Sequence, residues 1–284
     1  MRTCSVAVWS LLLWGCGSDS GNVTNPQVRL ISLAPHITEL VFTAGAGDSL
    51  VGVVEYSDFP EAAKSIPRIG DAFQIDLERI VALKPDFVLA WKSGNPEHSL
   101  SKLRDLGLTV VSFEPDSFES IASELRRIGE ITGSEERAND AADDFLNDLA
   151  SLRAEYAGKT PVRVFYQISA QPIFTVNGNH VISDAIELCG GENIFDDLEV
   201  LAPSVDLEAI LVRDPELIVF GVSFADQAKL QWGRLEDLSA SRLGGLREIP
   251  GEHLSRASTR MLSGVRQLCE FVEETRTARD SNAG

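Results

Sequence analysis

The chain has 284 residues and carries 43 acidic against 25 basic side chains, a formal net charge of −18 at pH 7. A surface with this charge repels phosphate backbones, which excludes nucleic acid as an expected partner. Apolar residues make up 44% of the chain, which is typical of globular proteins, and no run beyond the first residues has the length of a membrane span.

The first residues predict a secretory signal peptide. Arg2 precedes a short apolar stretch, VAVWSLLLW, and a polar run begins after Cys16. We expect residues 1–15 to be removed and residues 16–27 to form a flexible tether, which places the mature protein outside the cytoplasm, in the periplasm. The sequence LWGC resembles a bacterial lipobox, in which Cys16 carries a lipid and supplies the only contact with the membrane. Signal removal without lipidation is the alternative.

Alternating strand-like and helix-like segments follow. The expected strands are 29–34, 51–54, 86–91 and 109–113, and the expected helices are 38–44, 77–83 and 99–106. Alternation of this kind is typical of βαβ units around a mostly parallel sheet. We therefore predict an N-terminal α/β lobe over residues 28–133.

A long helix separates this lobe from a second one. Residues 117–132 form one predicted helix, Gly133 ends it, and residues 134–158 form a connecting helix whose apolar side chains recur at helical spacing. The elements expected after it are strands 163–168 and 173–176 and a helix over 183–189. We predict a C-terminal α/β lobe over residues 159–275 and a disordered tail over residues 276–284.

An internal repeat relates the two lobes. Residues 76–89 read DLERIVALKPDFVL and residues 206–219 read DLEAILVRDPELIV, with Asp, Leu, Glu, Ile and Pro at matching places. Each copy predicts a helix, a turn and a strand, and the aspartate that opens each copy is expected to cap its helix. Two roles stay open for Glu78 and Glu208: a favourable charge at the helix N-terminus, or docking onto a partner with two matching basic sites.

Two cysteines remain once the leader is removed and Cys16 is set aside, namely Cys189 and Cys269. An exported compartment is oxidising, so a disulfide between them is one interpretation. It would close a loop of about 80 residues and stabilise the fold by roughly 4 kcal/mol. Two buried free thiols are the other interpretation.

Four stretches together resemble one known family. ISLAPHITEL, VGVVEYSDFP, DLERIVALKPDFVLAWKSGN and ELCGGENIF are similar to the periplasmic cobalamin-binding proteins of bacterial ABC importers, within a wider cluster that also binds ferric siderophores and haem. The resemblance covers nearly the whole mature chain and implies a class III periplasmic binding protein. Such a protein is a monomer of two α/β lobes joined by a rigid helix. It holds a corrinoid such as cobalamin (vitamin B12) between the lobes and delivers it to an ABC permease dimer.

The resemblance also implies roles for individual residues in the cleft. Aromatic rings would hold the flat face of the corrin. The implied ligand contacts are Tyr56, Phe73, Trp91, Phe174, Glu252 and Arg256. Phe73 stands where well-known members carry a tryptophan, and another tryptophan of the family's site falls near Ala202.

Outside the cleft, the resemblance implies two further pairs. Glu78 and Glu208 match glutamates that meet arginines on the two permease subunits, which favours the docking role. Cys189 and Cys269 match a disulfide of the family, which favours the bonded state.

An enzyme and a metal-binding protein are the alternative classes. No G-x-S-x-G elbow or Walker loop occurs in the sequence, which disfavours an enzyme. The histidines lie in separate segments without the spacing of metal ligands, so we expect no metal site. They are His36, His98, His180 and His253. Haem or a ferric siderophore is the runner-up ligand, with Tyr56 or a histidine as contact. His36 is a candidate for the cleft because it follows the first strand, and Trp232 is expected in the core.

Overall fold

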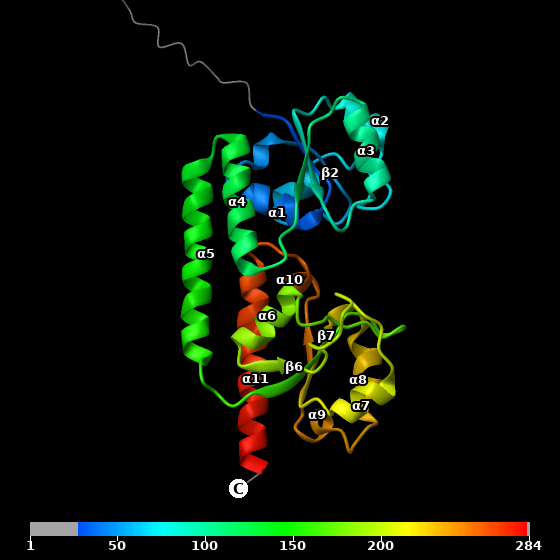
Figure 1. Cartoon of the computed structure of the whole chain (residues 1–284), viewed down its shortest axis with the longest axis vertical. Helices are drawn as coiled ribbons and strands as arrows, with labels where there is room; N and C mark the ends of the chain where they lie inside the picture. Colours follow the sequence, from blue (N-terminus) through cyan, green and yellow to red (C-terminus); the bar gives the residue numbers. More distant parts are fainter. Residues whose placement is uncertain (1–27, 283–284) are drawn as a thin grey trace, which may run out of the picture.

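Two four-stranded parallel sheets form the framework of the molecule (Figure 1). The computed structural model describes residues 28–282, so the predicted signal peptide (1–15), the tether (16–27) with Cys16, and residues 283–284 lie outside the described part. Within the described part, none of the helices is long and apolar enough to cross a membrane.

The N-terminal sheet has the order β2-β1-β3-β4, with every neighbouring pair parallel. Its strands are β1 (Leu30–Ser32), β2 (Leu50–Val53), β3 (Phe87–Trp91) and β4 (Val110–Phe113). The segments between them contain α1 (Pro35–Thr43), η1 (Gly47–Ser49), η2 (Glu61–Ser65), α2 (Leu77–Ala82) and α3 (Glu97–Asp105). Leu30 and Leu89 are buried in one apolar cluster and Ile31 and Val88 in another. Both faces of the sheet are therefore covered, which explains why the strands are continuous apolar runs.

The C-terminal sheet repeats this arrangement with the order β6-β5-β7-β8. Its strands are β5 (Val162–Gln167), β6 (Gly191–Asn193), β7 (Leu217–Gly221) and β8 (Leu246–Ile249). Its helices are α6 (Val181–Leu188), α7 (Leu207–Arg213), η3 (Val222–Phe224), α8 (Ala225–Gly233), α9 (Ser239–Arg242) and α10 (Glu252–Ser255). In both sheets the first and third strands are central and the second and fourth are at the edges. The predicted fold of two α/β lobes with parallel sheets is confirmed.

The predicted strand over residues 173–176 is wrong. Phe174 forms only isolated bridges, and Thr175 donates its amide hydrogen to the carbonyl of Pro203 (3.0 Å). This apolar segment therefore pairs with a neighbouring loop instead of joining the sheet. The second strand of the lobe is β6, whose sequence Gly-Glu-Asn has no strand pattern.

Long helices join the two lobes. α4 (Phe118–Thr132) packs against α5 (Glu135–Tyr156), and Figure 1 shows α5 alongside both lobes. Gly133 ends α4 in the left-handed conformation (φ 71°) that favours glycine at a helix end. Phe145 and Leu149 of α5 are buried in one apolar core that continues into α1 of the first lobe and α6 of the second. Because both lobes share this core, α5 is a rigid connection between them.

The predicted disordered tail over residues 276–284 is wrong for its described part. α11 (Met261–Asn282) continues to the last described residue. Arg276 is buried, and its guanidinium donates to the carbonyls of Thr160 (2.8 Å) and Gly190 (3.0 Å). The polar sequence of this segment is ordered because an arginine pairs with backbone acceptors of the C-terminal lobe.

The C-terminal lobe contains a disulfide and a buried tryptophan. Cys189, at the end of α6, is bonded to Cys269 of α11, with the two Cα atoms 4.6 Å apart. The structure thus has the bonded state rather than two free thiols. Trp232 of α8 is fully buried and donates from Nε1 to Oε1 of Gln167 (2.8 Å), which confirms its expected place in the core.

Candidate ligand-binding cleft

A cleft separates the two lobes at the carboxyl ends of their strands, where open parallel sheets usually bind ligands. It contains a cavity of about 110 Å³ with walls from both lobes. The N-terminal lobe contributes His36, Trp91, Ser93, Glu114, Pro115 and Asp116, and the C-terminal lobe contributes Asn179, His180, Val181, Leu201, Ser255 and Ala257. A second cavity of about 180 Å³ shares His180 and Ser255 and extends into the C-terminal lobe. The two cavities make this cleft the candidate binding site.

Trp91 is the predicted ligand contact that the structure brings to the cavity wall. It is the last residue of β3, and its amide donates to Oδ1 of Asn95 (2.7 Å). Its indole Nε1 donates to Oε1 of Glu114 (3.4 Å), and the same carboxylate accepts from the amide (2.8 Å) and hydroxyl (2.7 Å) of Ser93. The ring is therefore held in place before a ligand arrives, which reduces the entropy lost on binding.

His36 lies on the cavity wall as well. It is in the first turn of α1, directly after β1, and its ring meets the Trp91 ring edge to face, with centroids 5.2 Å apart. Burial, assisted by the charge of Arg256, lowers the pKa of His36 to about 4. The ring is thus neutral near pH 7, and its Nε2 is buried without a hydrogen-bond partner among the described residues. In the described part of the chain, no three ligand-type side chains come together to hold a metal ion.

The other predicted aromatic contacts lie outside the two cavities. Tyr56 and Phe73 are in loops and are 74% and 69% exposed, and Phe174 is half-buried. Glu252 is exposed at the first position of α10. The structure therefore brings Trp91 to the cavity wall but leaves these four side chains outside both cavities, with the rings of Tyr56 and Phe73 open to solvent.

Arg256, the predicted polar contact, is engaged between the lobes. Its Nη1 donates to Oε1 of Glu39 (3.0 Å) and to Oδ1 of Asp58 (2.6 Å), both from the N-terminal lobe. Glu39 is only 3% exposed and also accepts from Arg260 (2.8 Å) and Ser258 (2.6 Å). Burial opposes the ionisation of Asp58, but the hydrogen bond and charge of Arg256 outweigh it and hold the pKa of Asp58 below its ordinary value. This network fixes the two lobes to each other beside the cleft.

Sequence reasoning missed several residues of the cavity wall. Leu201 is 50% exposed and lines the cavity, next to Ala202. Glu114 directly follows β4, and Asp116 lies two residues further along the chain. Their position after a predicted strand was a usable signal, because the carboxyl ends of parallel strands meet at one edge of the sheet.

The two acid pairs of the internal repeat have the predicted local geometry. Asp76 caps α2 by accepting from the amide of Arg79 (3.0 Å), and Asp206 caps α7 by accepting from that of Ala209 (2.7 Å). The capping role of the aspartates is confirmed. Glu78 and its counterpart in α7, Glu208, are exposed and form no ion pair within the described part of the chain.

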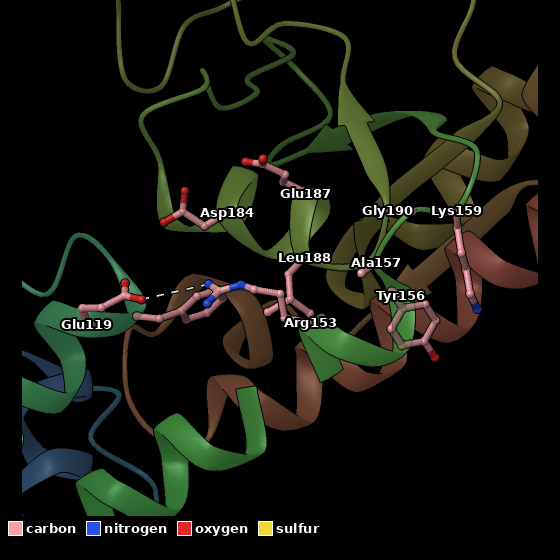
Figure 2. Close-up of a pocket in the computed structure, with 11 residues that line it drawn as sticks. Glu119, Arg153, Tyr156, Ala157, Lys159, Asp184, Glu187, Leu188 and Gly190 are labelled. Carbon is pink, nitrogen blue, oxygen red and sulfur yellow. Dashed lines mark ion pairs between the residues drawn. The ribbon is translucent and has the colours of Figure 1, made fainter. Parts of the chain in front are cut away.

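A larger cavity, of about 400 Å³, lies elsewhere, where the start of α4, the end of α5 and α6 meet (Figure 2). None of the predicted ligand contacts lines it. Figure 2 shows charged side chains of both signs around its mouth, with Arg153 directed toward Glu119 (4.0 Å). Lys159 covers the ring of Tyr156, with Nζ 4.5 Å from the ring centroid. The larger volume alone does not make this cavity the candidate ligand site, because Lys159 already covers the ring of Tyr156.

Known proteins resemble this chain in sequence. Residues 30–239 match the family of periplasmic binding proteins. A vitamin B12-binding protein of Vibrio cholerae is 38% identical over 249 residues, which cover 87% of this chain and 90% of that protein. A vitamin B12-binding protein of Yersinia pestis is 40% identical over 244 residues, 85% of each chain.

Solved structures show the same relationship. The crystal structure of the periplasmic vitamin B12-binding protein of Vibrio cholerae aligns with a TM-score of 0.82 and 37% identity, covering 88% of this chain and 98% of that one. A periplasmic haem-binding protein from Roseiflexus aligns with a TM-score of 0.78 but 21% identity, over 88% of this chain and 99% of that one, a likeness of fold alone. With its two parallel sheets, shared core and inter-lobe cleft, the chain belongs to the periplasmic binding protein family.

Proposed function

We propose that this protein captures a corrinoid, such as cobalamin, in the cleft between its lobes and delivers it to an ABC importer. The observation that carries the proposal is the position of Trp91. Its ring is held by Glu114 on the wall of a cavity that both lobes line. The curated relatives that align over most of the chain are named vitamin B12-binding proteins. The protein acts by binding and release, without a catalytic step.

Three aromatic residues outside the cavities form the proposed clamp. Tyr56 and Phe73 present large rings from the N-terminal lobe, and Phe174 presents one from the C-terminal lobe. Rings of this kind bury the apolar face of a flat macrocycle. Leu201 supplies apolar surface beside Ala202, where the clamp has no aromatic residue. Glu252 and Arg256 are the proposed polar contacts at the edge of the ligand.

Delivery depends on a second pair of residues. We assign docking on the permease dimer to Glu78 and Glu208, one on each lobe. Both are exposed at the second position of a helix whose cap is supplied by a neighbouring aspartate. Helix capping therefore does not occupy these glutamates, and their charges face solvent, where arginines of a partner can pair with them.

The proposed location is the periplasm, in keeping with the family. We further propose that the mature protein is a monomer that begins at Cys16 and is anchored to the membrane by a lipid on that residue. Mass spectrometry of the protein purified from bacterial membranes tests the anchor. A mature N-terminal peptide that starts at Cys16 with acyl chains attached is expected, and an unmodified N-terminus contradicts the lipid but not the binding function.

Calorimetry of the mature protein tests the ligand, using cyanocobalamin, haem and a ferric siderophore in turn. We expect cyanocobalamin to bind and Trp91→Ala to weaken its binding by about 2 kcal/mol, because a well-buried aromatic contact is lost. Leu230→Ala is the matched control, since Leu230 is an exposed apolar residue of α8 outside both cavities. Binding of haem without binding of cyanocobalamin would contradict the corrinoid assignment and leave the clamp in place.

A further inference from the structure

The walls of the cleft carry negative charge without positive charge. Glu114 and Asp116 line the inter-lobe cavity, and the side chains around the second cavity include no carboxylate. Within residues 28–282, no lysine or arginine lines either cavity. Sites that bind carboxylate ligands ordinarily pair them with arginine or lysine. The cleft has no such partner for an anionic ligand.

The arginine beside the cleft does not supply this charge. Arg256 lies between two lining residues, Ser255 and Ala257, but its side chain is only 15% exposed. Its guanidinium is bound to the carboxylates of Glu39 (3.0 Å) and Asp58 (2.6 Å). Arg260 also binds Glu39 (2.8 Å), so the two carboxylates balance the charges of the two arginines and the cluster has little long-range attraction for an anion.

Both histidines of the cavity are neutral near pH 7. Burial, with the charge of Arg256, lowers the pKa of His36 to about 4, and burial lowers the pKa of His180. Nδ1 of His180 accepts from the amide of Ile182 (3.1 Å), which places the proton of the neutral ring on Nε2. Neutral imidazoles exchange hydrogen bonds with carboxamides and bring no positive charge toward a carboxylate.

We propose that Glu114 and Asp116 make the cleft select tetrapyrroles edged with carboxamides over those edged with carboxylates. The inference rests on the proposed corrinoid-binding function and adds the basis of the choice. A corrinoid edge presents carboxamide N–H groups, from which the two carboxylates accept hydrogen bonds. A haem edge presents carboxylates, which they repel. The neutral histidines and the neutralised Arg256 leave this repulsion uncompensated.

A pair of ligands that differ by one group tests the proposal. Cyanocobalamin is compared by calorimetry with its monocarboxylic acid, in which one peripheral carboxamide is hydrolysed. We expect the acid to bind wild-type protein about tenfold more weakly, because it adds a like charge to the cleft. In the double variant Glu114→Gln, Asp116→Asn the difference falls to about twofold, since amides still accept hydrogen bonds but do not repel.

Two further variants separate the effect on ligand selectivity from a disturbance of Trp91 and from a general change in surface charge. Glu114 holds Trp91, whereas Asp116 is exposed and has no bond to it. Asp116→Asn alone should therefore reduce the difference between the two ligands without disturbing Trp91. The double variant Asp105→Asn, Glu130→Gln removes two exposed charges outside the cavity walls and should keep the tenfold difference.

The outcomes distinguish a failure of the proposed selectivity from a failure of the proposed corrinoid binding. Equal binding of cyanocobalamin and its acid to the wild-type protein overturns the selectivity and leaves corrinoid binding intact. A tenfold difference that persists in both cavity variants also overturns it. If neither corrinoid binds but haem does, the proposed function and the selectivity built on it are both wrong.

Discussion

The two lobes share one topology but present different chemistry at the cleft. In the N-terminal lobe, the ends of β3 and β4 are occupied by an indole and two carboxylates, from Trp91, Glu114 and Asp116. In the C-terminal lobe, the residues after β5 and β7 are the exposed apolar side chains Ile168 and Val222. The two sheets have the same strand order because that order depends on the buried apolar runs. A residue just beyond a strand is outside that packing, so it is free to differ between the lobes.

The lobes also differ in the bonds that stabilise them. In the described part of the chain, the C-terminal lobe has a disulfide and the long α11, and the N-terminal lobe has neither. Besides the apolar core that both lobes share, the N-terminal lobe is bound to its partner by Glu39, which accepts hydrogen bonds from three residues of the C-terminal lobe. The lobes therefore differ both in the bonds that stabilise them and in the residues they present to a ligand.

The largest expected effect comes from the disulfide, which is specific to the C-terminal lobe. Replacement of Cys189 and Cys269 by serine should lower the free energy of unfolding by about 4 kcal/mol, because the bond closes a long loop, 80 residues apart in sequence. Urea unfolding of the variant and the wild-type protein measures this. The wild-type protein with reductant should behave like the variant. A change below about 1 kcal/mol would show that the rest of the lobe carries the stability.

The next largest effect is a loss of stability at low pH, caused by His36 on the N-terminal side of the cavity. The pKa of His36 is about 4 in the folded protein against 6.5 for the free side chain. Above pH 6.5 the ring is neutral in both states and contributes no pH dependence. As the pH falls from 6.5 to 4, the unfolded chain takes up a proton that the folded protein does not, and about 3 kcal/mol of stability is lost.

Urea unfolding at pH 7 and pH 4 measures this loss in the wild-type protein and in His36→Gln. The variant should lose about 3 kcal/mol less between the two pH values than the wild-type protein does. His98→Gln, which removes an exposed histidine outside the cavity walls, is the control. An identical loss in the wild-type protein and His36→Gln would mean that His36 titrates as it does in water.

Docking is expected to depend on both lobes equally. Glu78→Ala and Glu208→Ala should each weaken binding to the permease by about 2 kcal/mol, because an arginine of the partner is left without its carboxylate. Corrinoid uptake by cells that depend on this importer, together with calorimetry of ligand binding, measures the two steps separately. Ligand affinity should not change, and Glu130→Ala, an exposed glutamate on α4, is the control. Intact uptake by the double variant would remove the docking role.

The smallest effect concerns the C-terminal wall, where Leu201 lines the cavity. Leu201→Trp should tighten corrinoid binding by about 1 kcal/mol, because a larger flat surface contacts the ligand. Val200→Trp is the control, since Val200 is exposed but does not line either cavity. Equal tightening by both variants would indicate a general apolar effect rather than a contact at this position.

Part of the site could be predicted from sequence and part could not. The resemblance implied Trp91 as a ligand contact, and the structure places this residue on the cavity wall; its contact with a ligand stays a prediction. The partners of Arg256 had no sequence signal, because Glu39 and Asp58 are about 200 residues away along the chain. Tyr56 and Phe73 remain proposed contacts, since they lie outside the cavity walls.

The sequence by itself determined the two α/β lobes, the long helix between them and the paired acids of the repeat. These features depend on local patterns: apolar runs, helical spacing and capping residues. Only the tertiary structure decided the rest. It made Gly191–Asn193 a strand through pairing with β5, and it ordered residues 276–282 through contacts of Arg276. It also joined the lobes through Glu39. In each case the deciding bonds link segments distant in the chain, and such bonds leave no local pattern to detect.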